Sequence, residues 1–271
     1  MARLMGIMAN RRDRIAAVAH QERDALASEL QDSSTTVSGI GIGFYQGDEV
    51  LHKKQPRRDS EPIAWRTFLE GVKTDCAVMH ARRPTVGDFR SENTHPFRYR
   101  RWLFAHTGTL ERFDAIRDGL RNAVHDFLLR NVRGQTDSEL LFHVILSFLH
   151  DAGRLDDRGV TGDDVVLAMR AAVSLVDRLS AEIGAPTPDY NILLTNGRLL
   201  GAMSRGARLH YVERVGLHDP PTGLDPVPVG DPRVLRYVFF ASGDEAPAGF
   251  ATVKDGSTLV VDRDIVLHVH E

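Results

Sequence analysis

Cysteine is almost absent from this sequence. Cys76 is the single cysteine among 271 residues, so a disulfide within the chain is excluded. Disulfide-rich domains belong to oxidising compartments, and their absence here favours a cytoplasmic protein. Cys76 itself lies in a short apolar run, where a lone cysteine is expected to pack as part of the core.

Long hydrophobic runs are also missing. No apolar stretch approaches the roughly 20 residues that a membrane-spanning helix needs. The N-terminal run LMGIMA is short and is followed at once by Arg11, Arg12 and Arg14, which does not fit a secretory signal peptide. The sequence therefore predicts neither a membrane segment nor a cleaved leader.

Neither sign of charge dominates the chain. A formal net charge of -3 gives no general attraction to nucleic acid or to a membrane surface. The stretch from Arg98 to Arg101 is rich in arginine, and we expect it to be a local, solvated surface. A hydrophobic fraction of 42% predicts ordinary globular folding.

Signals for metals and nucleotide cofactors are weak. His268 and His270 alternate along one strand, a spacing that can ligate a metal, but no cysteine or carboxylate cluster completes a site. The glycines of GIGIG (39–43) lack the third glycine that opens a helix in the dinucleotide fingerprint. We expect neither a metal nor a cofactor.

The apolar patterns run in the order strands, helices, strands. Short apolar runs and turn signals predict strands and hairpins over 2–8, 38–54, 76–80, 102–106, 190–206, 236–242, 249–254, 257–261 and 264–270. Helical spacing predicts helices over 14–30, 135–150 and 161–184. This order indicates an α+β fold with sheets packed together and helices outside them.

Local signals mark several of these boundaries. Thr136 with Glu139, and Thr161 with Asp164, have the spacing of a capping box at a helix start. Gly184 can end the helix over 161–184 in the left-handed conformation. The proline-rich segment 219–232 is expected to form a surface loop. No boundary divides the chain, so we predict one domain over 1–271.

Four stretches carry candidate chemistry: HARRPTVG (80–87), NTHPF (93–97), FAHTGTL (104–110) and GQTDSE (134–139). Each alone has an ordinary structural explanation. His80 and His106 can be core histidines, Asp137 can favour a helix N-terminus, Arg82 can form a surface ion pair and Gly108 can serve a turn.

Taken in order, with MARLMG at the start and GIGFY (41–45) after it, the four stretches resemble the motifs of the class II glutamine amidotransferases. These enzymes are N-terminal-nucleophile hydrolases, and the chain is most similar to their small stand-alone bacterial branch. The resemblance spans nearly the whole chain. It implies a four-layer αββα sandwich.

The resemblance also implies roles for particular residues. Arg82 would grip the α-carboxylate of glutamine with its planar guanidinium, and Asp137 would accept hydrogen bonds from the α-amine. Gly108 would offer a backbone N–H to an oxyanion. His80 and Thr85, from the same motif as Arg82, would line the substrate. The implied ligand is glutamine or a γ-glutamyl compound.

Two positions depart from the family pattern. Ala2 stands where the family has its nucleophilic cysteine, so no thioester can form there. Thr107 stands where the family has an asparagine that donates to the oxyanion, and loss of one such donor typically slows the reaction about 100- to 1,000-fold. Cys76 has no free α-amine to act as base. Thr107 would need a base, and His106 points to the opposite face of the strand.

Three hypotheses follow for the function. The first is a catalytically silent amidotransferase homologue that still binds glutamine or a γ-glutamyl compound. The second is an active amide hydrolase or amidotransferase with non-standard chemistry. The third is a structural or interaction protein with a relic pocket, which would act through a protein partner or as a homo-oligomer. An engineered substitution would explain Ala2 but not Thr107, so the two departures together favour natural decay or repurposing. The retained Arg82 and Asp137 support the first hypothesis.

Overall fold

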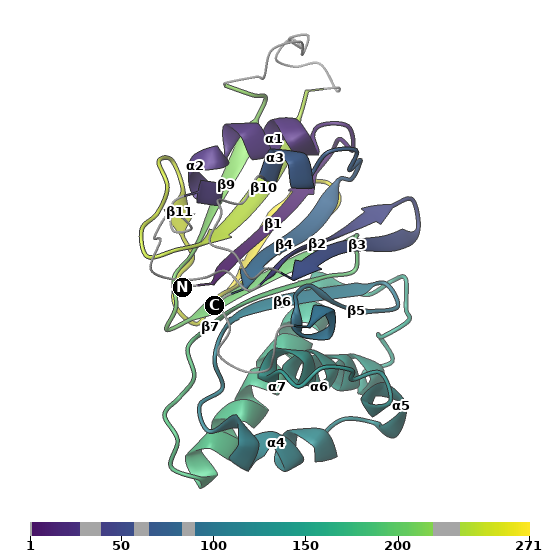
Figure 1. Ribbon diagram of the computed structural model, residues 1–271, viewed down its shortest axis with the longest axis vertical. Helices are drawn as coiled ribbons and strands as arrows, with labels where there is room; N and C mark the ends of the chain where they lie inside the picture. The colour runs from purple at the N-terminus through teal and green to yellow at the C-terminus, as the bar shows by residue number, and fades with distance from the viewer. Residues whose placement is uncertain (1, 28–38, 57–64, 83–89, 219–233) are drawn as a thin grey trace.

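Two antiparallel sheets stack face to face in this protein, with helices on the outer side of each (Figure 1). The computed structural model describes residues 2–27, 39–56, 65–82, 90–218 and 234–271. The layers run helix, sheet, sheet, helix. The structure thus confirms the expected αββα sandwich.

The first sheet has seven strands in the order β11-β9-β10-β1-β4-β2-β3. Its strands are β1 (Arg3–Ala9), β2 (Gly39–Gln46), β3 (Glu49–Pro56), β4 (Cys76–Arg82), β9 (Leu209–Val215), β10 (Arg236–Ser242) and β11 (Ala251–Thr252). The short helices α1 (Ile15–Gln21), α2 (Arg23–Ala27) and α3 (Trp65–Phe68) cover its outer face.

The second sheet has six strands in the order β13-β12-β8-β7-β6-β5. Its strands are β5 (Phe97–Tyr99), β6 (Trp102–Gly108), β7 (Tyr190–Thr195), β8 (Leu200–Arg205), β12 (Thr258–Val261) and β13 (Leu267–His270). The helices α4 (Phe113–Asn122), α5 (Asp126–Leu129), α6 (Asp137–Asp151) and α7 (Gly162–Glu182) pack below it, and the 3₁₀ turn η1 (Ser91–Asn93) precedes β5.

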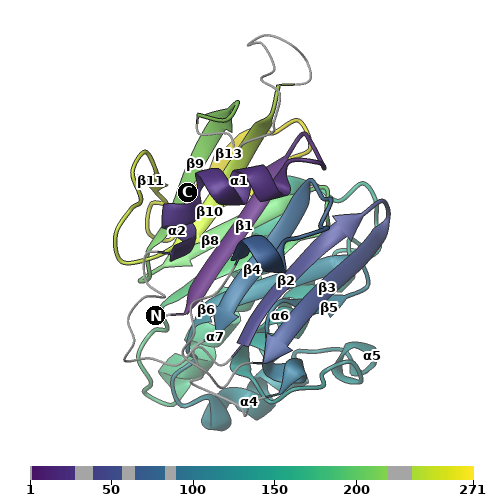
Figure 2. The ribbon, with the colours of Figure 1, turned by 45° about the horizontal axis from the view of Figure 1, so that its top comes forward.

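Alternation along each strand separates the core into layers. In β1, Met5 and Ile7 pack toward α1 and α2, whereas Leu4 and Met8 pack against the second sheet. This is the two-residue period of a strand buried on both faces. The turned view in Figure 2 shows β1 and β4 side by side in the middle of the first sheet.

The glycines of GIGIG allow the second sheet and its connections to lie close to β2. A Cβ on Gly41 would lie 2.0 Å from the carbonyl oxygen of His95, and one on Gly43 would lie 2.8 Å from Leu103. Larger residues would push the two layers apart. The pattern therefore serves sheet packing, in line with its poor match to a nucleotide-binding loop.

The long helix α7 confirms the capping prediction. Thr161 accepts a hydrogen bond from the Asp164 N–H, the Asp164 carboxylate accepts one from the Thr161 N–H, and Gly184 has φ of 61° just past the helix end. At α6 only half of the box forms. Thr136 caps the Glu139 N–H, but the Glu139 carboxylate accepts from the N–H groups of Arg133 and Gly134 instead.

The prediction of one helix over 14–30 was wrong. The helix breaks at Glu22 into α1 and α2, although the local sequence has no glycine or proline there. Glu22 is buried and accepts a hydrogen bond from the Tyr237 hydroxyl at 2.5 Å and from Arg214 at 3.3 Å. A contact with distant strands therefore ends the helix. Residues 28–30 lie outside the described part of the chain.

Smaller differences occur in the C-terminal strands. The segment 249–254 forms only the two-residue strand β11. The hairpin at Asn196-Gly197 exists, but Thr195 pairs with Leu200, so four residues connect the strands. In the described ranges, no helix combines the length and apolarity needed to cross a membrane.

Replacing Gly41 with alanine tests the close approach of the layers. The new methyl group would overlap the backbone of His95, which cannot rotate away, so we expect a loss of about 1–3 kcal/mol in the free energy of unfolding. Urea denaturation measures it. Gly159→Ala is the control, because a Cβ there meets only the Asp157 side chain at 3.2 Å. Equal stability of the two variants would contradict the packing explanation.

Candidate active site

The candidate site lies where β1 begins and where β4 and β6 end. Arg3 pairs with Ala81 and Leu4 with His80, so Ala2 and Arg82 follow one step further along adjacent strands. Alternation turns Ala2, His80 and Arg82 toward the second sheet, as it does Leu4. In that sheet β6 lies opposite β1 and β4. Thus the chain brings together the candidate residues of three separate motifs.

The start of β1 is held without any contribution from residue 2. Arg3 is buried and points to the outer face, where its Nε donates to the Ala25 carbonyl at 3.0 Å and its Nη1 donates to the Ser242 carbonyl. The Leu4 N–H donates to the Ser242 hydroxyl at 2.9 Å. The backbone at Ala2 is therefore fixed whether or not the side chain carries a thiol.

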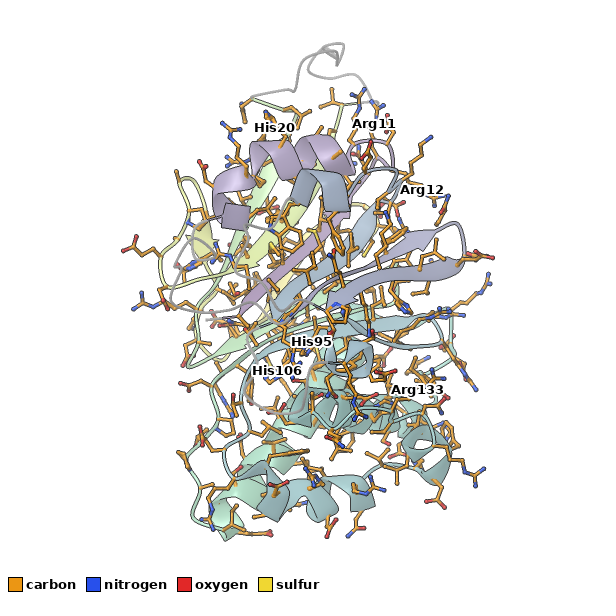
Figure 3. All side chains as sticks on the ribbon, in the orientation of Figure 1. Arg11, Arg12, His20, His95, His106 and Arg133 are labelled. Atoms are coloured by element: carbon orange, nitrogen blue, oxygen red, sulfur yellow. The ribbon has the colours of Figure 1, made fainter. Side chains whose placement is uncertain are left out.

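The buried imidazoles of His80 and His95 interact electrostatically with Arg82. His80 and Arg82 are 1% and 4% exposed, and the ring of His95 lies 4.2 Å from that of His80. Figure 3 labels His95 and His106, which lie near each other between the first sheet and the helices below the second. Burial, reinforced by the charges of His106 and Arg82, lowers the pKa of His80 to about 3. Burial, followed by the charges of His80, His106, Lys54 and Arg82, holds the pKa of His95 well below its usual range. At neutral pH both imidazoles are therefore uncharged, whereas Arg82 stays positive.

His106 and Thr107 face opposite sides of β6. The His106 Nδ1 lies 2.9 Å from the Ser138 hydroxyl, on the helix side. Thr107 faces the first sheet, and its hydroxyl accepts a hydrogen bond of 3.3 Å from the Asn191 amide. His106 is thus directed away from Thr107, which counts against its acting as a base for that hydroxyl.

Gly108 occupies a position that no other residue fits. Its φ is 136°, and a Cβ there would lie 2.2 Å from the carbonyl oxygen of Asp189 on the way into β7. Gly108 is exposed, unlike the rest of β6. Its backbone is therefore accessible at the open edge of the site.

Asp137 links the end of β6 to the start of α6. Its Oδ2 accepts from the Leu110 N–H at 2.8 Å, and its Oδ1 accepts from the Ser138 N–H at 2.7 Å. The carboxylate is 3% exposed. The carboxylate supports the N-terminus of α6, which is the structural role expected of it from the sequence. Through Leu110 it also fixes the segment that follows Gly108. The Ser138 hydroxyl also donates to Oδ1 at 3.2 Å, so Oδ2 is the oxygen that keeps a further lone pair for a ligand.

The remaining candidate residues include one that is not described and three that lie away from this site. Thr85 lies outside the described residues. Cys76 is fully buried at the far end of β4, where burial raises the pKa of its thiol to about 12. His268 and His270 each face their own carboxylate, Asp262 at 3.1 Å and Asp163 at 3.6 Å. In the described part of the chain, no group of three or more potential ligands could hold a metal.

Sequence reasoning missed Asn191. This buried residue pairs with Thr107 across β6 and β7, and its amide also donates to the Arg208 carbonyl while its Oδ1 lies 2.8 Å from the Ser204 hydroxyl. It places a carboxamide next to the position where the family motif has its own. Only strand pairing reveals this, because the two residues are 84 positions apart.

Comparison with known proteins identifies the family and the fold. The family model described as "Glutamine amidotransferases class-II" matches residues 1–222. The "Probable glutamine amidotransferase DUG3" of Saccharomyces cerevisiae is 32% identical over 141 residues, which is 50% of this chain and 39% of the yeast protein. A Haemophilus influenzae relative is 27% identical over 76% of this chain and 64% of its own length. The chain thus spans less than two thirds of either relative.

Solved structures agree on the fold. A glutamine aminotransferase class-II domain protein from Silicibacter pomeroyi superposes with a TM-score of 0.60 at 18% identity, over 99% of this chain and 98% of that one. The glutamine phosphoribosylpyrophosphate amidotransferase of B. subtilis gives 0.59 at 16% identity, over 99% of this chain and 48% of the other. At these identities the likeness concerns the fold alone.

The buried histidines predict a pH dependence of stability. Because the pKa of His80 in the folded state lies below its unfolded value of about 6.5, the unfolded chain takes up the proton first as the pH falls. Stability is therefore retained above pH 6.5 and declines below it, by about 1.4 kcal/mol per pH unit for each histidine that stays neutral. Urea denaturation between pH 7.5 and 5 measures the slope.

The His80→Asn variant should show a shallower decline than the unaltered protein over this range. His150→Asn, at an exposed position on α6, controls for the loss of an imidazole. A slope that is unchanged in His80→Asn would show that His80 takes up its proton equally in both states.

Proposed function

The chain belongs to the class II glutamine amidotransferases, and on that basis we propose that it binds glutamine or a γ-glutamyl compound without hydrolysing it. The carrying observation is the buried Arg82 at the end of β4, one strand away from Ala2. The residue suited to holding the substrate is present, and the position of the nucleophile offers a methyl group.

Electrostatics favours an anionic group beside Arg82. The imidazoles of His80 and His95 stay neutral, so an α-carboxylate would pair with the buried guanidinium of Arg82. A charge-assisted, bidentate pair in such a place gains strength from the low local dielectric. Asp137 would accept from the α-amine, completing the recognition of an amino acid head group.

The side-chain amide of the ligand would then lie toward Ala2, Thr107 and Gly108. The Gly108 N–H and the Thr107 hydroxyl can donate to its carbonyl oxygen. Hydrolysis needs a nucleophile at residue 2, where the family uses a thiol with the α-amine of the same residue as base. Alanine supplies no such atom. The amide bond of the ligand would stay intact.

Binding is tested by titration calorimetry with glutamine, glutamate and a γ-glutamyl dipeptide. We expect at least one of them to bind, and Arg82→Ala to weaken it about 10- to 100-fold, the usual effect of losing a charged hydrogen-bonded pair. Arg117→Ala, which removes an exposed charge on α4, should bind as the unaltered protein does. Absence of heat with all three compounds would remove the ligand-binding function and favour the interaction protein with a relic pocket.

Reversion tests why the chemistry is missing. Ala2→Cys and the double variant Ala2→Cys/Thr107→Asn are assayed for release of ammonia from glutamine after removal of the initiator methionine. We expect the double variant to hydrolyse glutamine, faster than Ala2→Cys alone by up to about 100- to 1,000-fold. A double variant that folds but stays inert would show that the site has lost more than these two groups.

Non-standard catalysis makes the opposite prediction for the unaltered chain. Release of ammonia or glutamate above a heat-inactivated control, abolished by Thr107→Val, would establish an active hydrolase. The direction of His106 away from Thr107 argues against this outcome.

A further inference from the structure

At the end of the sandwich opposite Ala2, five connections surround a hollow of about 580 Å³. The β2–β3 and β5–β6 turns, the α6–α7 connection, the β7–β8 loop and the β12–β13 turn meet here. The hollow is of the size that small-molecule sites commonly have. Its charged lining consists of Arg98, Arg100, Arg101, Arg158, Arg198 and Arg263 together with Asp48, Glu49 and Asp156.

The charge of this lining is opposite to that of the whole chain. Six arginines face three carboxylates, whereas the formal net charge of the protein is -3. Arg100 pairs with Asp156, Arg158 lies 3.8 Å from Asp48, and Arg263 shares Asp75 with Arg12. The segment Arg98–Arg101, expected to be solvated, is thus one side of a convergent basic surface.

Within the part of the chain that the structure describes, three arginines of the lining have no carboxylate partner. Arg98, Arg101 and Arg198 form no ion pair with any other residue that the structure describes. The nearby Asp157 is already bound, since the Gly159 N–H, the Arg154 guanidinium and then the charge of Arg101 lower its pKa. A hollow with uncompensated guanidinium groups on its wall concentrates anions.

The turns that carry Arg101 and Arg198 are rigidly supported. The Tyr45 hydroxyl lies 2.7 Å from the Arg101 carbonyl and 2.9 Å from the Thr195 carbonyl, so one side chain ties both turns together. Gly197 lies so close to Tyr45 that a Cβ would be 2.6 Å from the ring. The Asn196 side chain accepts from the N–H groups of Arg198 and Leu199. The backbone positions of these arginines are therefore set before any ligand arrives.

We propose that this hollow binds a small anion that carries two or more phosphate groups. Guanidinium forks match the paired oxygens of phosphate, and three groups without carboxylate partners suit a ligand with several charges. The exposed carboxylates Asp48 and Glu49 at the rim would oppose a nucleic acid lying across it. A compact anion seated between the arginines avoids them. The site is separate from the candidate glutamine site and does not depend on its function.

Tripolyphosphate is a suitable probe, titrated into the full chain by calorimetry in 150 mM NaCl without divalent cations. We expect one binding site per chain. The double variant Arg101→Gln/Arg198→Gln should weaken binding at least about tenfold, because each lost guanidinium removes charged hydrogen bonds. Both changes leave the backbone contacts of Tyr45 and Asn196 in place. A thermal unfolding curve confirms that the variant folds.

The matched control is Arg121→Gln/Arg178→Gln, which removes the same charge from exposed positions on α4 and α7. It should bind the probe as the unaltered protein does. The proposal is overturned if the unaltered chain gives no binding at millimolar probe, or if both double variants lose affinity equally, which would indicate general attraction. Binding of single-stranded RNA that requires Arg101 and Arg198, without binding of tripolyphosphate, would also overturn it.

Discussion

Close contact between the two sheets is the constraint on which the rest of the structure depends. It is tightest where glycines of the first sheet face the second: a Cβ on Gly6 would lie 2.8 Å from Leu193, and one on Gly41 would lie 2.0 Å from the His95 carbonyl. Because side chains are absent there, the strands that carry Ala2, His80 and Arg82 approach β6. The candidate residues of the two sheets can come together because no bulky side chain separates the sheets at these glycines.

The same burial determines the electrostatics of the site. His80 and His95 are excluded from water and stay neutral, while Arg82 retains its charge because a guanidinium does not deprotonate in proteins. A ligand carboxylate could pair with this buried guanidinium, which connects the packing of the sheets with the proposed recognition of an amino acid.

Structure and chemistry are separable at the N-terminus. Arg3 and Ser242 hold the start of β1, and Asp137 holds the segment after Gly108, through contacts that involve neither a thiol nor an oxyanion donor. The fold can therefore persist when Ala2 and Thr107 replace reactive groups. At the opposite end of the same sheets, the Tyr45 hydroxyl holds the turns that carry Arg101 and Arg198. These turns form part of the wall of the basic hollow.

Local sequence determined the features that depend on neighbouring residues. The capping box of Thr161 and Asp164, the left-handed Gly184 and the order of the family motifs could all be read directly, because each is a relation within a few residues or a recurring pattern. The sandwich fold followed from that pattern.

Tertiary structure alone decided the remainder. Glu22 ends its helix because Tyr237 and Arg214 bind it from strands about 200 residues away. Asn191 meets Thr107 through strand pairing, and arginines from four separate parts of the chain converge at one end of the sheets. None of these contacts has a local signal, since hydrogen bonds and charges between distant segments arise only when the sheets have stacked.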